Sequence, residues 1–151
     1  MKYVLGIDFG GGASKATLLS ESGEIKAVST TEYKTYYPQN GFVEQKGEDW
    51  YQALRENVKN ILENSGISAN DIAAISIDAA THTAVLCDEN FNILRPSIYW
   101  TDTRSTAQSK FLSENFGEEI MKKTFHKPST IWTLPQMLWL YENEGETFKK
   151  I

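Results

Sequence analysis

The first 33 residues constrain the fold most, because they alternate short apolar runs with turns too short to join anything but neighbouring strands. An apolar run over Tyr3–Phe9 is followed by three glycines, and residues 13–20 are again rich in small, β-branched and aliphatic side chains. A turn at Ser22 and Gly23 leads into a third extended run, residues 25–33. Short turns join antiparallel neighbours, so the sequence predicts a three-stranded meander.

The rest of the chain mixes helical and extended patterns. Residues 48–64 place apolar side chains at helical spacing, and Gly66 suits the end of that helix. The other expected elements are a buried strand over residues 71–78, a strand over 83–87, an extended segment over 93–100, helices over 104–116 and 118–124, a helix with Pro135 in its first turn, and a helix interrupted midway at 147–151. This order predicts an α/β or α+β fold, in which helices flank a mixed sheet.

Composition excludes several classes of protein. A chain of 151 residues with a net charge of −5 is one domain or a fragment, and it lacks the clustered Lys and Arg of a general nucleic-acid binder. No apolar run approaches the length of a membrane span, and the N-terminus does not resemble a signal peptide. One cysteine and two histidines cannot build a thiolate or imidazole metal cage. A cytoplasmic protein without membrane or nucleic-acid partners is expected.

The glycine turn after the first strand is a candidate phosphate site. It matches neither the Walker loop nor the dinucleotide fingerprint, because Lys15 stands where the latter needs a glycine and a strand pattern follows. Gly10, Gly11 and Gly12 can bring backbone N–H groups close to phosphate oxygens, and Ser14 and Lys15 add side-chain donors. Asp8, just before the turn, could orient a hydrated Mg²⁺. The alternative is a tight hairpin in which Asp8 only accepts turn N–H groups and Lys15 points to solvent or pairs with an acid.

Four stretches together resemble the FGGY carbohydrate kinases. The glycine turn looks like the first phosphate motif of the actin, heat-shock chaperone and sugar-kinase ATPase superfamily. Residues 40–50, NGFVEQKGEDW, resemble the family's GWVEQDPEDWW, and residues 93–105, ILRPSIYWTDTRS, resemble LRPAILWNDTRS. Residues 133–144, TLPQMLWLYENE, resemble TAPKLLWLKENEP. The motifs occur in the family's order along nearly the whole chain, and residues 75–88 are most similar to xylulokinases.

The resemblance implies a fold, cofactors and a reaction. Family members transfer the γ-phosphoryl group of ATP, with Mg²⁺, to a sugar hydroxyl, and they place the sugar between two ribonuclease-H-like lobes. Residues 1–151 would be the sugar-binding N-terminal lobe, with the catalytic base and most of the adenosine site beyond Ile151. The fragment alone is then expected to be inactive, and a homodimer of the full-length protein stays open.

The same resemblance supplies candidate sugar contacts. His82 matches the family's sugar-contacting His, although Thr81 and Thr83 replace its usual Met and Gly neighbours. Trp100 could stack on the sugar or be part of the core. Asp102 and Arg104 could receive hydroxyl groups or pair with each other, and sugar contact is favoured for Asp102 and pairing for Arg104. The candidate substrate-binding residues are Thr81, His82, Trp100, Asp102 and Arg104.

Departures from the family pattern leave alternatives open. Gly11 and Gly12 replace the hydroxyl residues usual in the first phosphate motif, and the changes around His82 leave the sugar undecided. The primary hypothesis is a kinase of a ketose, D-xylulose. Another sugar or polyol of the family (ribulose, gluconate or glycerol) and a non-catalytic binding module with the same fold are the alternatives.

Overall fold

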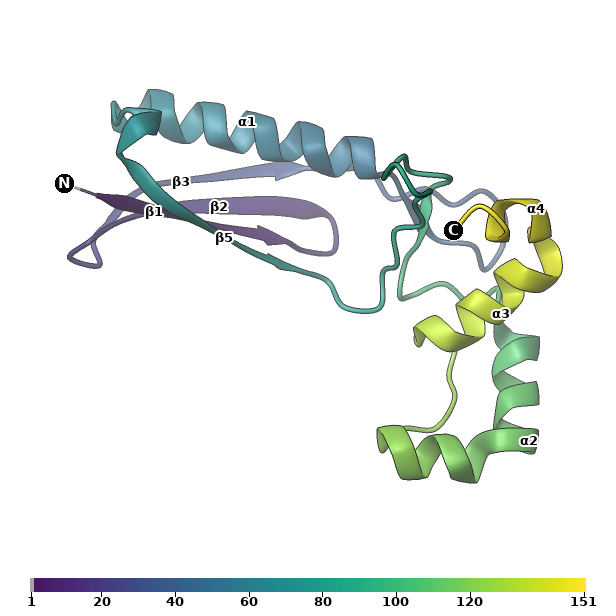
Figure 1. Cartoon of the computed structure of the whole chain (residues 1–151). Helices are drawn as coiled ribbons and strands as arrows, with labels where there is room; N and C mark the ends of the chain where they lie inside the picture. Colours follow the sequence, from purple (N-terminus) through teal and green to yellow (C-terminus); the bar gives the residue numbers. More distant parts are fainter. Residues whose placement is uncertain (1) are drawn as a thin grey trace. The chain divides into compact units, whose positions relative to one another are not determined.

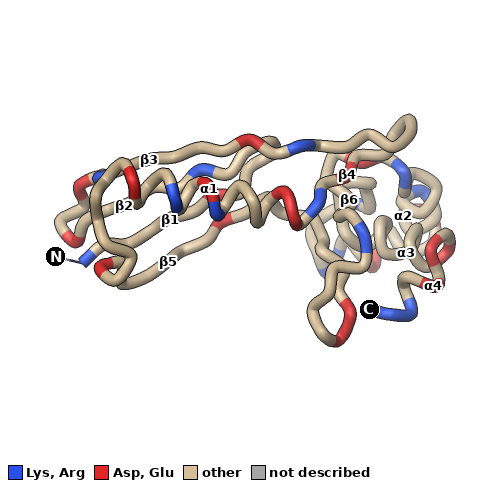
Figure 2. Tube along the Cα trace, turned by 90° about the horizontal axis from the view of Figure 1, so that it is seen from above, with Lys and Arg blue, Asp and Glu red and all other residues tan. Residues whose placement is uncertain are grey.

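The computed structural model describes residues 2–151. The chain divides into two compact units, the first made of residues 1–34 and 48–80 and the second of residues 35–47 and 81–151. Acidic and basic positions are interspersed along the trace of both units, and no long basic run occurs in residues 2–151 (Figure 2). None of the helices in this described part combines the length and the apolar character that crossing a membrane requires.

The first unit is a mixed sheet with a helix along one face (Figure 1). Its strands are β1 (Tyr3–Phe9), β2 (Ala13–Ser20), β3 (Ile25–Glu32) and β5 (Ile72–Ala79), its long helix is α1 (Gly47–Ser65), and a 3₁₀ turn (Ala69–Asp71) precedes β5. The sheet order is β3-β2-β1-β5, in which β1 pairs antiparallel with β2 and parallel with β5. The predicted meander and the mixed sheet flanked by helices are both confirmed.

Alternation along the strands builds the core of this unit. Leu5 and Ile7 of β1 and Leu18 of β2 point to the face that α1 covers, and Ile61 of α1 packs against them. The buried positions of α1 are Ala53, Asn57 and Ile61, spaced one helical turn apart. Strand side chains two residues apart and helix side chains one turn apart therefore pack against each other in one apolar layer.

The prediction of a buried strand over residues 71–78 is correct for the strand and wrong for its burial. Ile75 and Ile77 of β5 are 60% and 62% exposed. A run of Ile and Ala is typical of a parallel strand covered on both faces. Within residues 2–151, however, β5 is an edge strand that pairs only with β1.

The second unit contains little regular sheet. A two-stranded antiparallel ladder joins β4 (Glu44–Gln45) to β6 (Ser97–Ile98), and the helices are α2 (Thr106–Thr124), α3 (Thr133–Asn143) and α4 (Gly145–Phe148). A small apolar cluster of Leu86, Ile98 and Leu140 forms its core. The expected position of Pro135 in the first turn of a helix is confirmed.

Three predictions for this unit need correction. Residues 83–87 form no strand but only two isolated bridges, Ala84 with Ile98 and Cys87 with Ile93. The two helices expected on either side of Gly117 are one continuous helix, because a glycine inside a helix weakens it without ending it. The helix expected over 147–151 is the short α4, which ends at Phe148.

Candidate functional site

The hairpin between β1 and β2 carries the first candidate site. Asp8 of β1 lies directly across from Lys15 of β2 in the antiparallel register, and both side chains are exposed. The turn is closed by a bond from the Gly10 N–H to the Ala13 carbonyl, 3.0 Å. A Cβ on Gly10 would lie 3.4 Å from that carbonyl oxygen and 3.8 Å from Asp8 Oδ2, so the carboxylate lies against the bare turn.

The turn leaves fewer phosphate donors than the sequence predicts. The Gly10 N–H is bonded to the Ala13 carbonyl within the hairpin, so it is not a donor for phosphate. Gly10 could only leave room for a ligand to come close to the backbone. Gly11 and Gly12 are exposed, and nothing lies within 4 Å of a Cβ built on Gly12. Tyr33 supports the turn from β3's end, since its hydroxyl donates to the Gly10 carbonyl and its N–H to the Gly12 carbonyl at 3.0 Å.

Ser14, expected among the phosphate-binding donors, faces the other way. It is fully buried, and its carbonyl accepts a bond of 2.9 Å from Asn57 Nδ2 of α1. Successive strand residues point to opposite faces, so Lys15 shares the exposed face of Asp8 and Ser14 cannot. The structure therefore assigns the Ser14 side chain to the core and leaves Lys15 as the side-chain donor of the hairpin.

A second carboxylate, which the sequence reasoning missed, lies beside Asp8. Asp78 of β5 is the register partner of Asp8 in the parallel β1–β5 pair, and it too is exposed. Its Oδ1 accepts a bond of 2.9 Å from the N–H of Ala79. Each aspartate is the next-to-last residue of an apolar strand, and that shared pattern is the signal that could have revealed the pair. The two carboxylates line a shallow hollow of about 320 Å³ together with Gly6, Ile7, Lys15, Thr17 and Ser76.

This arrangement fits a hydrated Mg²⁺. Two exposed carboxylates on neighbouring strands offer the hard oxygen ligands that Mg²⁺ prefers, and Mg²⁺ usually takes only one or two carboxylates from the protein. Within residues 2–151 there is no group of three or more His, Cys, Asp or Glu side chains placed to hold a metal. Lys15, which lines the same hollow, would face the anionic ligand of such an ion.

The second candidate site surrounds His82 in the other unit. His82 has a positive φ of 56°, a left-handed conformation that non-glycine residues adopt rarely and mostly where the surroundings hold them. Its ring contacts Trp132 edge-on, with 4.3 Å between ring centroids. The two lie on a cavity of about 270 Å³ whose walls come from the His82 loop, α2 and the start of α3. Thr81, one residue earlier, is exposed.

Trp100 does not line the His82 cavity. It is 41% exposed and lies against Tyr99, with 5.9 Å between ring centroids. The sequence left open whether Trp100 stacks on the sugar or belongs to the core; the aromatic ring that the structure brings to His82 is Trp132.

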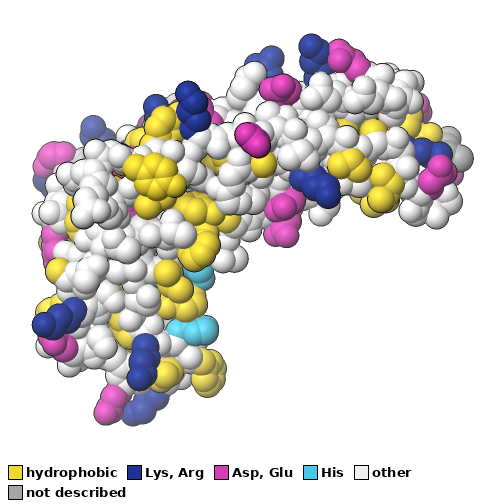
Figure 3. Space-filling model, turned by 180° about the vertical axis from the view of Figure 1, so that it is seen from behind, with side chains coloured by type: hydrophobic (Ala, Val, Ile, Leu, Met, Phe, Trp, Pro, Cys, Tyr) yellow, Lys and Arg dark blue, Asp and Glu magenta, His cyan; other side chains and the backbone are white. Residues whose placement is uncertain are grey.

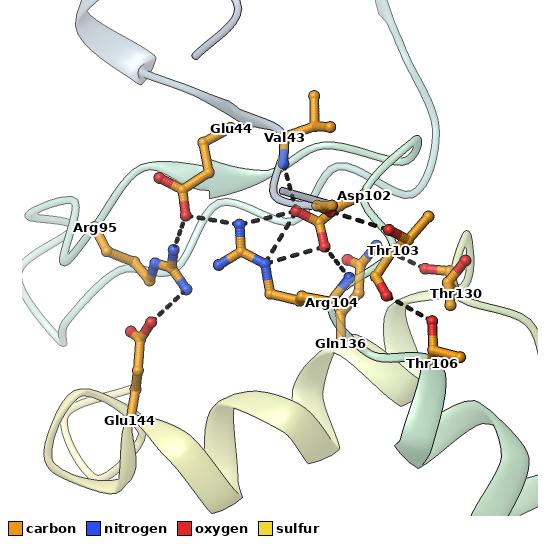
Figure 4. Close-up of polar contacts among 11 residues, drawn as sticks. Val43, Glu44, Arg95, Asp102, Thr103, Arg104, Thr106, Thr130, Gln136 and Glu144 are labelled. Carbon is orange, nitrogen blue, oxygen red and sulfur yellow. Dashed lines mark hydrogen bonds and ion pairs between the residues drawn. The ribbon is translucent and has the colours of Figure 1, made fainter. Parts of the chain in front are cut away.

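Asp102 and Arg104 form a buried ion pair, so the mutual pairing that the sequence left open is the arrangement observed. Arg104 Nη2 lies 2.9 Å from Asp102 Oδ2 and 2.8 Å from Glu44 Oε1, and the Arg104 side chain is 1% exposed (Figure 4). Asp102 also accepts the N–H of Val43 at 2.6 Å. Its side chain is fully buried, so the expected sugar contact of Asp102 is not supported.

The network extends further through the second unit. Arg95 bonds to Glu44 Oε1 and lies 3.0 Å from Glu144 Oε1, which links β4 to the end of α3. The Arg104 guanidinium lies over the Phe42 ring, 3.9 Å from its centroid, and is 5.0 Å from the centroid of the Trp139 ring. Glu44, for which the sequence offered no role, is the carboxylate that joins the two arginines.

Comparison with known proteins defines the class. Residues 3–151 match the N-terminal domain model of the FGGY family of carbohydrate kinases. A xylulose kinase of Bacillus subtilis is 38% identical over 150 residues, which cover 99% of this chain and 30% of that protein. A glycerol kinase of Rhizobium meliloti is 32% identical over 147 residues, covering 93% of this chain and 29% of the relative.

Solved structures agree with the sequence comparison. A structure described as a xyloylose kinase from Brucella ovis superposes with a TM-score of 0.93 at 27% identity, covering 99% of this chain and 31% of that one. The chain thus spans about 30% of the length of the relatives it matches. It belongs to the FGGY family of carbohydrate kinases, to whose N-terminal domain it corresponds.

Proposed function

We propose that this chain is the sugar-binding part of an ATP-dependent kinase that phosphorylates a ketose, D-xylulose, on a hydroxyl group. The observation that carries the proposal is the exposed Asp8 at the mouth of a glycine hairpin, with Lys15 across from it, in a chain of this family. Most of the similar relatives are xylulose kinases, which supports D-xylulose.

The hairpin supplies positioning and charge. Phosphoryl transfer depends on aligning the transferred group and neutralising its charge, with little covalent help from the protein. Asp8 would hold Mg²⁺, Lys15 would donate to a phosphate oxygen, and the bare turn at Gly11 and Gly12 would let phosphate approach the backbone. Bound Mg²⁺ would neutralise charge on the phosphate oxygens.

His82 would orient the sugar. A neutral imidazole has one donor and one acceptor nitrogen, which suits a hydroxyl that must be held in one orientation. The positive φ of His82 sets the direction of its ring at the wall of the cavity. The group that accepts the hydroxyl proton is not assigned to residues 1–151.

The test uses the protein expressed from the complete reading frame that contains these residues. Transfer from ATP is measured with D-xylulose, D-ribulose, gluconate and glycerol, because a glycerol kinase and a gluconokinase are also among the relatives. The highest kcat/KM is expected for D-xylulose. A higher value for another substrate would overturn the assignment of the sugar, and no transfer to any of them would support a non-catalytic binding module.

Asp8→Asn separates the two parts of the proposal. The amide keeps the size of the side chain but loses the charge that would hold Mg²⁺, so transfer should fall by a factor of about 10³ or more while sugar affinity stays within about twofold. Glu21→Gln, in the exposed turn after β2, is the matched control and should leave both unchanged. Loss of sugar affinity in Asp8→Asn would indicate a structural role for Asp8 instead.

A further inference from the structure

The cavity beside His82 contains a second histidine and a tryptophan that no motif singled out. We infer that Trp132, whose ring contacts those of His82 and His126, is the stacking surface of the sugar site, and that His126 is a second imidazole that contacts the substrate. The inference rests on the proposed function, because it assigns the sugar to this cavity.

Three rings from two loops meet here. The Trp132 ring lies 4.3 Å from His82 at 80° and 4.4 Å from His126 at 33°, measured between centroids and ring planes. His82 comes from the loop after β5, His126 from the loop after α2, and Trp132 precedes the first residue of α3. The only two histidines of the chain lie close together among apolar side chains on one face of the molecule (Figure 3).

Both imidazoles are placed by unusual backbone. Among residues 2–151, three non-glycine residues have positive φ, and two of them serve this cluster: His82 itself, and Phe125, at 61°, directly before His126. Phe125 ends α2 in the left-handed conformation that glycine usually supplies, and its side chain is 83% exposed. Because the Phe125 side chain is exposed, its own burial does not account for the left-handed backbone at this position. That backbone conformation directs the next residue, His126.

Trp132 is not a member of the packed core. The apolar cluster of this unit is formed by Leu86, Ile98 and Leu140, with Met137, Trp139 and Phe148 packed against it. Trp132 is only half-buried and borders an open cavity of about 270 Å³, whereas packed interiors leave few voids larger than a water molecule. An aromatic ring that borders open space is available to a ligand.

The chemistry of the walls selects a class of ligand. The indole face suits the C–H groups of a carbohydrate, and two imidazoles can donate to or accept from its hydroxyl groups. The remaining polar groups on the cavity are those of Thr124, Lys127 and Thr133, and no carboxylate is among the described residues that line it. The site therefore fits a neutral polyhydroxylated sugar, or one with a carboxylate near Lys127, and disfavours an amino sugar.

The four tryptophans provide the experiment. The indole N–H signals of Trp50, Trp100, Trp132 and Trp139 are followed by NMR while the protein is titrated with D-xylulose and, separately, with glucosamine. A saturable shift of Trp132 with D-xylulose, and none with glucosamine, is expected, while Trp50 on α1 stays unchanged. If only Trp100 shifts, the inference is wrong and the proposed sugar function stands; if no indole shifts, both are wrong.

Substitutions test whether the rings contact the sugar. Trp132→Leu should weaken D-xylulose binding roughly tenfold and Trp132→Phe less, because phenylalanine keeps part of the stacking surface. Phe111→Leu removes an exposed aromatic of α2 that lies outside the cavity lining, and it should leave affinity unchanged. Thermal unfolding of each variant is measured alongside; a loss of stability in Trp132→Leu without a change in affinity would overturn the inference.

The role of His126 is tested with variants that keep either its ring or its hydrogen-bonding groups. His126→Phe keeps a ring on Trp132 but has no nitrogen, so it should lose affinity roughly tenfold, as should His126→Ala. His126→Gln restores a donor and an acceptor and should recover part of the loss. In kinetic assays the change should appear in KM for the sugar more than in KM for ATP. Wild-type sugar affinity in His126→Phe would exclude a polar contact with the substrate.

Discussion

The two units of the chain are stabilised in different ways. In the first, apolar side chains of β1, β2 and α1 meet in one layer, with Leu5, Leu18 and Ile61 almost fully buried. In the second, short apolar contacts are supplemented by a buried network in which Arg104 joins Asp102 to Glu44 and Arg95 joins Glu44 to Glu144 (Figure 4).

The difference follows from the amount of regular structure. Strands and helices satisfy their own backbone groups and can bury a continuous apolar face. The second unit has long irregular segments, whose backbone groups need other partners, and Asp102 supplies one by accepting the Val43 N–H. Buried charge here orders loops, and it is tolerated only while every partner is present.

The largest expected effect comes from breaking the buried network. Arg104→Met should cost about 3 to 5 kcal/mol of unfolding free energy, because it leaves the Asp102 carboxylate buried without its cation. Urea unfolding measures the loss, and hydrogen exchange of the Val43 amide should show it locally. Arg55→Met, on the exposed face of α1, is the matched control. A loss no larger than the control's would mean that the network does not stabilise the second unit.

A cavity in the apolar layer should cost somewhat less. Leu18→Ala removes a fully buried side chain from β2 and is expected to lose about 3 kcal/mol by urea unfolding. Hydrogen exchange should increase in β1, β2 and β3. Ile25→Ala, at a position 61% exposed in β3, is the control for an apolar truncation outside the core. Similar values for the two variants would contradict the assignment of Leu18 to the core.

A smaller effect tests how far the first unit depends on polar contacts. Asn57 of α1 is fully buried; its Nδ2 donates to the Ser14 carbonyl and its Oδ1 accepts from Thr31 Oγ1, both at 2.9 Å. Asn57→Ala should cost about 1 to 3 kcal/mol, since it leaves the buried Ser14 carbonyl and the half-buried Thr31 hydroxyl without this partner. Asn60→Ala, one turn nearer the end of the helix with a longer 3.3 Å bond to Ser29 Oγ, should cost less. A larger loss of unfolding free energy in Asn57→Ala than in Arg104→Met would mean that the first unit depends on polar contacts more than the second does.

The predictability of each region follows the same contrast. The meander and α1 were predicted within a few residues because their signals are local: alternation in the strands, helical spacing and a terminal Gly66. The segment at residues 83–87 was predicted as a strand from its apolar composition, but its only ladder contacts are single bridges. An apolar run by itself does not show whether a segment has a partner strand.

The candidate sites were predicted in part. The hairpin that carries Asp8 was predicted from local pattern, and strand alternation is the signal that separates exposed Lys15 from buried Ser14. Asp78 was missed because its partnership with Asp8 depends on a parallel pairing of strands far apart in the chain. Nothing in the sequence marks Trp132 as a site residue, because an aromatic residue at the start of an apolar helix is usually packed in the core.

The sequence by itself determined the family, the meander, the long helix and the hairpin with its acid, because each depends on residues close together in the chain. Tertiary structure alone decided that Asp78 lies beside Asp8, that Arg104 pairs with both Asp102 and Glu44, and that the rings of two histidines contact Trp132. The physical reason is the distance along the chain between the residues that determine each feature. Hydrophobic periodicity is a local property of the chain, whereas a charge or a ring finds its partner only after folding brings distant segments together.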